Sequence, residues 1–198
     1  MYKIIKGYQK NEELRQSFNA LAMETFNLNF EDWHQNGFWG ENYIPYSMVI
    51  DEKVVANVSV NITDIMFEGN KKHLIQLGTV MTAKEYRNKG LIRQIMGEIE
   101  ADYKEKVDGI YLFANDTVLD FYPKFGFERS LEYQYSMQVA NSCNCQLEKI
   151  LMSNKDAWNQ IIDVINQNVF RGKFDMMGNN ELIMFYVTKY MQECVYYH

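Results

Sequence analysis

The chain has 198 residues, of which 47% are hydrophobic and 23% charged, with a formal net charge of −6. This composition is typical of a globular protein, and the acidic balance argues against nucleic-acid binding, which requires a basic face. The uncharged runs fall short of the ~18 residues of a membrane span, and the first residues lack the apolar run of a signal peptide. Three cysteines favour a reducing compartment, so we expect a cytoplasmic protein with no membrane partner.

The N-terminal part predicts a strand, two helices and a hairpin. Residues 2–6 are typical of a short strand, and Asn11 is placed to cap a helix whose apolar residues recur at helical spacing. Residues 30–46, which are rich in aromatic side chains, predict a short helix and a loop. Residues 46–50 and 54–62 then predict a hairpin, because β-branched residues are dense in its second arm.

Further along, helices and strands alternate. A third strand over 74–81 is followed by an apolar stripe of period near 3.6, which predicts an amphipathic helix over 90–106. A buried strand over 110–114, a short helix over 116–122 and a strand near 133–139 complete this part. The order predicts an α+β fold, in which a mixed, mostly antiparallel central sheet is flanked by helices and contains one parallel crossover.

Residues 141–198 follow as a C-terminal extension. Residues 155–164 predict a helix and residues 182–187 a strand, so we expect an α/β extension. Because no linker separates it from residues 1–140, the extension is expected to pack on that main domain.

The segment Lys84-Glu85-Tyr86-Arg87-Asn88-Lys89-Gly90-Leu91-Ile92-Arg93 carries four positive charges and one negative charge in an acidic protein. It lies between a predicted strand and a predicted helix, where free backbone N–H groups and the helix dipole favour an anion. Gly90 allows a close backbone approach or a positive φ. A pyrophosphate would suit such a loop. The alternative is a solvated basic turn before an ordinary amphipathic helix.

This segment resembles the cofactor signature of the GCN5-related N-acetyltransferase (GNAT) family, Arg/Gln-x-x-Gly-x-Gly/Ala after a strand. Arg87-Asn88-Lys89-Gly90-Leu91-Ile92 matches the first four positions and departs at the last, where Ile92 replaces a small residue. The strand end, Val80-Met81-Thr82, has Thr82 where proline is frequent in the family.

The resemblance implies that acetyl-CoA is a co-substrate held mainly by backbone. The amides of Arg87, Asn88, Lys89, Gly90, Leu91 and Ile92 would bind the pyrophosphate, and the pantetheine arm would run beside Val80, Met81 and Thr82 like an added strand. That arrangement needs a gap between two strands, and Gly78 next to Thr79 is expected to form a bulge that opens one. Ile92 would be tolerated with its side chain in the core, as the apolar stripe indicates.

A second segment matches the same family. An asparagine at a strand end is followed seven residues later by tyrosine and then by Gly-Phe, here Asn115, Tyr122, Gly126 and Phe127. The resemblance implies that Asn115 bonds the cofactor arm and that Tyr122 is the general acid. A phenol of pKa ~10 suits protonation of a thiolate whose conjugate acid has a pKa of ~8.5. The alternative is that these aromatic residues only fill the core.

Two features leave the acceptor side open. Trp33, Phe38, Trp39 and Tyr43 would either wall an acceptor pocket or belong to the core. No residue has a spacing that marks it as the base that deprotonates the amine. The conceivable residues are Glu24, Glu41, Asp64 and Gln76, and a chain of water molecules would also serve.

The sequence therefore predicts an acetyl-CoA-dependent N-acetyltransferase acting on a primary amine. A small-molecule acceptor is favoured over a protein, and the protein is expected to be a monomer or homodimer. We expect no metal, because Cys143-x-Cys145 is one close ligand pair where structural zinc sites usually have two. The alternative is a non-catalytic acyl-CoA-binding regulatory or interaction domain.

Overall fold

A six-stranded sheet forms the centre of the computed structural model, in which residues 2–138, 147–167 and 172–197 are described. Five strands follow the order β1-β2-β3-β4-β5, and β7 pairs with β3. All neighbours are antiparallel except β4 and β5, which are parallel. The strands of this sheet are β1 (Lys3–Lys6), β2 (Tyr43–Ile50), β3 (Lys53–Phe67), β4 (Asn70–Thr82), β5 (Gly109–Leu112) and β7 (Phe174–Met177).

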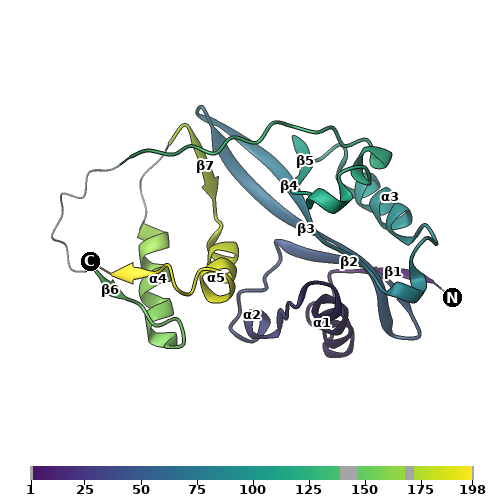
Figure 1. Ribbon diagram of the computed structural model, residues 1–198, viewed down its shortest axis with the longest axis horizontal. Helices are drawn as coiled ribbons and strands as arrows, with labels where there is room; N and C mark the ends of the chain where they lie inside the picture. Colours follow the sequence, from purple (N-terminus) through teal and green to yellow (C-terminus); the bar gives the residue numbers. More distant parts are fainter. Residues whose placement is uncertain (1, 139–146, 168–171, 198) are drawn as a thin grey trace.

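Helices cover both faces of the sheet. Figure 1 shows α1 and α2 on one side and α3 on the other. The α-helices are α1 (Glu12–Phe26), α2 (Glu31–Gln35), α3 (Leu91–Tyr103), α4 (Lys155–Gln167) and α5 (Asn180–Lys189). Short elements complete the fold: the 3₁₀ turns η1 (Lys84–Tyr86), η2 (Asp116–Val118) and η3 (Tyr122–Phe125), and the strand pair β6 (Glu148–Lys149) and β8 (Tyr196–Tyr197). The predicted fold class, a mixed and mostly antiparallel sheet flanked by helices, is confirmed.

The first helix forms for the reasons that the sequence suggests. The side chain of Asn11 accepts a hydrogen bond of 3.0 Å from the backbone N–H of Leu14, which satisfies one of the free donors of the first turn. The helix is capped at its C-terminus by Asn27, which has a left-handed backbone conformation with a φ of 55°. Its buried face, which includes Phe18, packs on one side of the sheet in an aromatic cluster. The other rings of this cluster include Phe30, Trp33, Trp39 and Phe185.

The predicted strand near Tyr133–Val139 is wrong for the part of it that the structure describes. Residues 128–138 form neither helix nor strand, and Val139 lies outside the described residues. Leu131, Tyr133, Tyr135 and Met137 alternate along the chain as in a strand, yet Tyr135 is 93% exposed. Alternation alone provides no hydrogen-bonding partner. In Figure 1 this segment leaves the β5 region and crosses toward the C-terminal extension.

The extension contains one confirmed and one wrong prediction. The helix predicted over 155–164 is present as α4. The strand predicted over 182–187 is instead the middle of α5. A short apolar run fits a buried strand and a buried helix equally well, so length and packing decide between them. Here Met184 and Phe185 are buried within a helical turn, and β7 supplies the extension's strand in the sheet.

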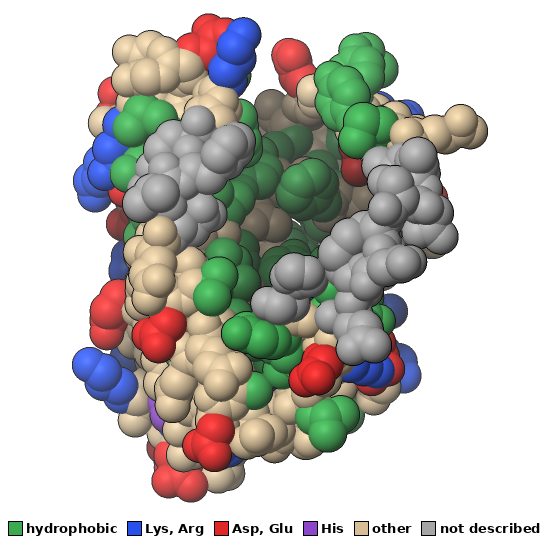
Figure 2. All heavy atoms as spheres, turned by 90° about the vertical axis from the view of Figure 1, so that its left-hand side faces the viewer, with side chains coloured by type: hydrophobic (Ala, Val, Ile, Leu, Met, Phe, Trp, Pro, Cys, Tyr) green, Lys and Arg blue, Asp and Glu red, His purple; other side chains and the backbone are tan. Residues whose placement is uncertain are grey.

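Contacts of α5 fasten the extension to the main sheet. Phe185 stacks on Phe30 with ring centroids 5.3 Å apart, and Lys189 pairs with Asp32 at 3.0 Å. Figure 2, which looks onto the face of the extension, shows a hollow lined by hydrophobic side chains. No described helix is both long enough and apolar enough to cross a bilayer.

Replacing Phe185 with alanine should therefore lower the free energy of unfolding by about 3 kcal/mol, because a ring that is only 9% exposed is lost from the aromatic cluster. Urea unfolding measures the effect. Phe113→Ala is the matched control, since this ring is 73% exposed, and it should change stability by less than about 0.5 kcal/mol. Equal losses in the two variants would contradict the docking of α5 described above.

Candidate functional site

A bulge interrupts β4 where it passes the centre of β3. Ser59 pairs with Gly78 and Asn57 with Met81, so Thr79 and Val80 together lie opposite the single residue between Asn57 and Ser59. Thr79 has a φ of 48°, which is a strained backbone conformation for a β-branched residue. The predicted bulge beside Gly78 is confirmed.

Buried hydrogen bonds hold the strained residue in place. The side-chain amide of Asn57, which is 0% exposed, donates to the carbonyl of Thr79 at 2.9 Å and to Ser59 Oγ at 2.9 Å. Its own Oδ1 accepts from Ser47 Oγ at 2.8 Å, and that hydroxyl lies 2.5 Å from the Tyr8 hydroxyl. From the other side, the hydroxyl of Tyr43 lies 2.5 Å from Thr79 Oγ1. The bulge is therefore fixed by a connected polar network inside an apolar core.

Beyond the bulge, β4 and β5 separate. Their parallel pairing covers only Leu74–Leu77 with Gly109–Leu112. From Gly78 to Thr82 the edge of β4 that faces β5 has no strand partner among the described residues, although its other edge still pairs with β3. Val80 and Thr82 are half-buried here and Met81 is buried. This open edge could accept an extended molecule by backbone hydrogen bonding.

The loop before α3 presents a run of unused backbone donors. Tyr86 N–H bonds to Ala83 and Arg87 N–H to Lys84, and the next backbone bond is from Gln94 N–H to Gly90 at 3.2 Å. Within the described part of the chain, the N–H groups of Asn88 through Arg93 have no acceptor. Asn88 and Gly90 have φ values of 60° and 71°, which are left-handed conformations of the kind found in anion-binding turns. The helix dipole adds to its attraction for an anion.

The side chains of this loop make different contacts: one bonds the backbone of β4, one lies over an aromatic ring, and two pack in the core. Arg87 donates from Nε to the carbonyl of Thr82 at 3.2 Å, which ties the loop to the open edge of β4. Lys89 Nζ lies 4.8 Å from the centre of the Tyr86 ring. Leu91 is buried, and Ile92 packs against the apolar core under α3. The branched side chain that departs from the family signature is therefore directed into the core, as the sequence predicted.

Tyr122 lies next to the first turns of α3. The guanidinium of Arg93 sits 5.2 Å from the Phe125 ring, which places η3 against this helix. The half-buried ring of Tyr122 makes edge contacts with Phe121 and Phe127, and burial raises the pKa of its hydroxyl. None of the described residues bonds that hydroxyl. Tyr122 and Leu77 line an open groove of about 1440 Å³ beside α3 and β5.

Asn115 follows β5 and starts η2, where its carbonyl accepts from Val118 N–H at 3.0 Å. Its side chain is exposed and makes no bond to a described residue. The structure thus brings the loop at 87–92, the open edge of β4 and Tyr122 around one end of α3. The groove beside Tyr122 does not include the loop itself.

The residues considered as a base are mostly engaged elsewhere. Glu24 pairs with Lys84 at 3.5 Å, and Glu41 with Lys10 at 3.6 Å. Asp64 contacts both Lys71 at 2.7 Å and His73 at 2.6 Å, and these bonds lower the pKa of its carboxyl group. Gln76 is an amide and lies opposite Asn61. Where the structure is described, no three histidine, cysteine or acidic residues are grouped to bind a metal; Cys143 and Cys145 lie outside it.

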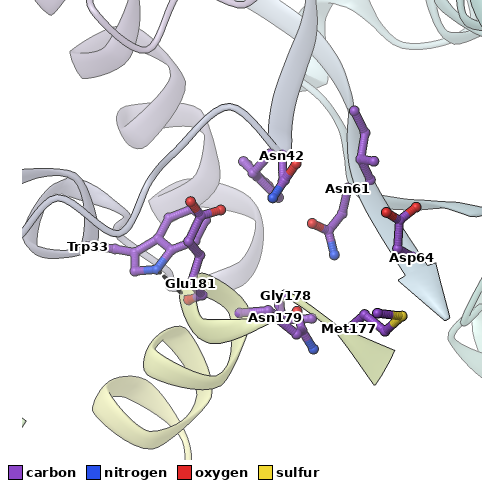
Figure 3. Close-up of a pocket in the computed structure, with 11 residues that line it drawn as sticks. Trp33, Asn42, Asn61, Asp64, Met177, Gly178, Asn179 and Glu181 are labelled. Atoms are coloured by element: carbon purple, nitrogen blue, oxygen red, sulfur yellow. Dashed lines mark hydrogen bonds between the residues drawn. The ribbon is translucent and has the colours of Figure 1, made fainter. Parts of the chain in front are cut away.

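The aromatic residues belong to the core, but two of them also line a small pocket. Trp33, Trp39 and Tyr43 pack around Phe30. Phe38 lies at the margin of this cluster, and the centre of its ring is 5.9 Å from that of Trp158. The pocket, of about 160 Å³, is lined in part by Trp33 and Tyr43. It lies between Asn42 and Asn61 on one side and the Gly178–Asn179 turn on the other (Figure 3).

Sequence reasoning missed Asn57 and Glu181. Asn57 could have been predicted to hold a hydrogen-bond network, because it lies in the apolar run 54–62 and a buried amide needs hydrogen-bonding partners. Glu181 lines the small pocket, and nothing in the pattern around it indicated this, since the adjacent run was interpreted as a strand.

Asn57→Ala should lower the unfolding free energy by about 2–3 kcal/mol, because the Thr79 carbonyl and two buried hydroxyl groups lose their partner. Thermal or urea unfolding tests this. Asn70→Ala, at the exposed start of β4, removes a single 3.3 Å bond and should be nearly neutral. A similarly small effect of Asn57→Ala would show that the network does not hold the bulge.

Known proteins resemble this chain in sequence and in structure. The family model described as an acetyltransferase (GNAT) domain matches residues 8–130. No curated protein matches the sequence of this chain.

Among solved structures, a probable N-acyltransferase of unknown function from Enterococcus faecalis V583 is 25% identical, with a TM-score of 0.55 over 65% of this chain. This chain spans about a third (32%) of that protein. An aminoglycoside acetyltransferase from an uncultured soil metagenomic sample is 14% identical, with a TM-score of 0.54 over 69% of this chain and 97% of the other.

A predicted acetyltransferase from Clostridium acetobutylicum, solved with acetyl-CoA, is also 14% identical, with a TM-score of 0.55 over 69% of this chain and 96% of the other. The last two resemblances concern the fold alone. The match of the family model covers more than half of the sequence and includes the bulged strand, the loop and Tyr122. The chain belongs to the GNAT acetyltransferase family.

Proposed function

We propose that the protein is an N-acetyltransferase that moves the acetyl group of acetyl-CoA to a primary amine of a small molecule, with Tyr122 as general acid. The observation that carries this proposal is the run of unused N–H groups from Asn88 to Arg93, located beside the open edge of β4. A non-catalytic acyl-CoA-binding domain would share these two features but would not need Tyr122.

The residues present suit coenzyme A. A diphosphate matches the run of unused amides at Asn88–Arg93, and the basic side chains of Arg87 and Lys89 add positive potential. A pantetheine arm carries amide groups, which match the unpaired backbone between Gly78 and Thr82. When bound, acetyl-CoA supplies an activated acetyl group as a thioester. Asn115, with its free side chain at the end of β5, is proposed to bond the same arm.

The chain's own groups would assist transfer in two ways. A preorganised backbone N–H between Gly78 and Thr82 would stabilise the negative charge that develops on the carbonyl oxygen during attack. As the C–N bond forms and the C–S bond breaks, the hydroxyl of Tyr122 would give its proton to the departing sulfur. The proton lost by the amine would return to the Tyr122 oxygen through water. Because burial raises the pKa of this phenol, it stays protonated at neutral pH and remains able to donate.

The acceptor side is proposed to be formed jointly by residues 1–140 and the extension at 141–198. β7 pairs with β3, and α5 packs beside Trp33, so the extension borders a small pocket that would fit a small amine group. One of the structural relatives is an aminoglycoside acetyltransferase, whose acceptors are small amines by name. Both points favour a small-molecule amine over a protein.

Gly90→Asn and Gly90→Asp form a matched pair that tests the anion site. Both side chains tolerate the positive φ of Gly90, and they differ by one negative charge. We expect the aspartate variant to bind coenzyme A about tenfold more weakly than the asparagine variant at low salt, because a carboxylate would face the diphosphate. Isothermal titration calorimetry measures both. Equal affinities would place the diphosphate elsewhere.

Tyr122→Phe should lower kcat about 100-fold while leaving the affinity for coenzyme A within twofold, since only the proton donor is removed. Thiol release from acetyl-CoA in the presence of amines measures kcat. Phe121→Leu serves as a packing control in the same segment and should retain most activity. Unchanged turnover in Tyr122→Phe would rule out its role as general acid.

A further inference from the structure

The small pocket occupies a gap along one edge of β3. β2 pairs with β3 up to Asn61, and β7 begins to pair at Asp64, so the two strands share this edge and stop short of each other. The gap, of about 160 Å³, is closed by the turn after β7 and the start of α5. Figure 3 shows the amide end of Asn61 directed toward the Gly178–Asn179 turn. A space of this size suits a small polar group rather than a whole ligand.

Glu181 gives the pocket a negative charge without a matching cation. Among the residues that the structure describes, no lysine or arginine pairs with its carboxylate. Burial raises the pKa of this carboxyl group, while a hydrogen bond with Asn42 acts in the opposite direction. The other acidic lining residue, Asp64, already pairs with Lys71 and is hydrogen-bonded to His73. A half-buried carboxylate of this kind is stabilised by a cation.

The position of Glu181 is fixed by its surroundings. Trp33 Nε1 donates to the backbone carbonyl of Glu181 at 2.9 Å, which anchors the first turn of α5 (Figure 3). The carboxylate lies against Gly40, where any side chain would collide with it. Trp33 and Tyr43 are among the residues that line the pocket. A carboxylate beside aromatic rings is the combination that binds ammonium groups.

The pocket lies to one side of the bulge in β4. Tyr43 pairs with Asn61 on β3, and Asn61 pairs with Gln76 on β4, so two strand spacings, about 10 Å, separate β2 from β4. The Tyr43 side chain crosses this distance, because its hydroxyl lies 2.5 Å from Thr79 Oγ1. A group held by Glu181 is therefore distinct from a group that reacts at the open edge of β4.

We propose that Glu181 is the counter-ion for a second, non-reacting ammonium group of the acceptor, so that the acceptor is a small diamine or a larger amine with two cationic groups. This inference rests on the proposed N-acetyltransferase function. It assigns the extension a direct part in acceptor choice, because Glu181 lies in α5, outside the family match at 8–130.

The test compares 1,6-diaminohexane with hexylamine, which has the same chain and one amine fewer. Thiol release gives kcat/KM for both amines in the wild type, Glu181→Gln, Gly40→Ala and the control Glu193→Gln. Glu193 is an exposed acidic residue of the extension that lies outside the pocket and pairs with Lys149. Gly40→Ala keeps the carboxylate but pushes it from its position.

We expect the wild type and Glu193→Gln to prefer the diamine about tenfold or more, mainly through KM. Glu181→Gln and Gly40→Ala should lose most of that preference while they retain hexylamine turnover and coenzyme A affinity. No preference in the wild type, or a preference that survives Glu181→Gln, would overturn the inference.

Calorimetric titration of 1,6-diaminohexane in the presence of coenzyme A tests the pocket without turnover. Diamine binding that weakens about tenfold in Glu181→Gln supports the role of Glu181, even if no amine releases thiol. Absence of thiol release with every amine would contradict only the proposed acetyltransferase function. Binding of equal strength in Glu181→Gln and the wild type would overturn the inference about Glu181.

Discussion

The architecture depends on one strained residue in a central strand. Thr79 adopts a left-handed backbone conformation, and the buried amide of Asn57 bonds its carbonyl from the neighbouring strand. The bulge ends the regular path of β4 immediately after its pairing with β5 stops at Leu77. A strand edge that would otherwise be paired is therefore left open in the middle of a sheet. Because the network that holds it is buried and connected, this open edge is a stable feature of the fold.

The same strand leads directly to the loop before α3. Arg87 bonds back to Thr82, so the run of unused amides and the open edge are held at a fixed relation to each other. Tyr122 is held near the other side of α3 by the packing of η3 against Arg93. On the opposite face of the sheet, α5 supplies Glu181 beside Trp33. The proposed cofactor loop and the acceptor residue Glu181 thus lie on different elements. Tyr43, which lines the pocket of Glu181, contacts the bulge through its hydroxyl at Thr79.

Local sequence signals predicted the central sheet well and the extension poorly. The hairpin at 46–62, the helix after Gly90 and the bulge near Gly78 each have a local cause, namely β-branched residues, a 3.6-residue apolar period and a glycine in a strand. The strand predictions near 133–139 and over 182–187 were wrong where the structure describes them. Whether such a segment becomes a strand depends on pairing and packing partners that are distant in the sequence. Glu181 became visible as a site residue only once α5 was seen to lie beside Trp33, since tertiary placement has no local signal.

The central claim is that the backbone N–H groups from Asn88 to Arg93 bind the diphosphate of coenzyme A. Amide hydrogen exchange, measured by NMR with and without saturating coenzyme A, reports on these groups one by one. The account predicts strong slowing of exchange across 88–93, with little change in the exposed turn at Gly69. Exchange at 88–93 that stays the same in the coenzyme A complex would contradict it.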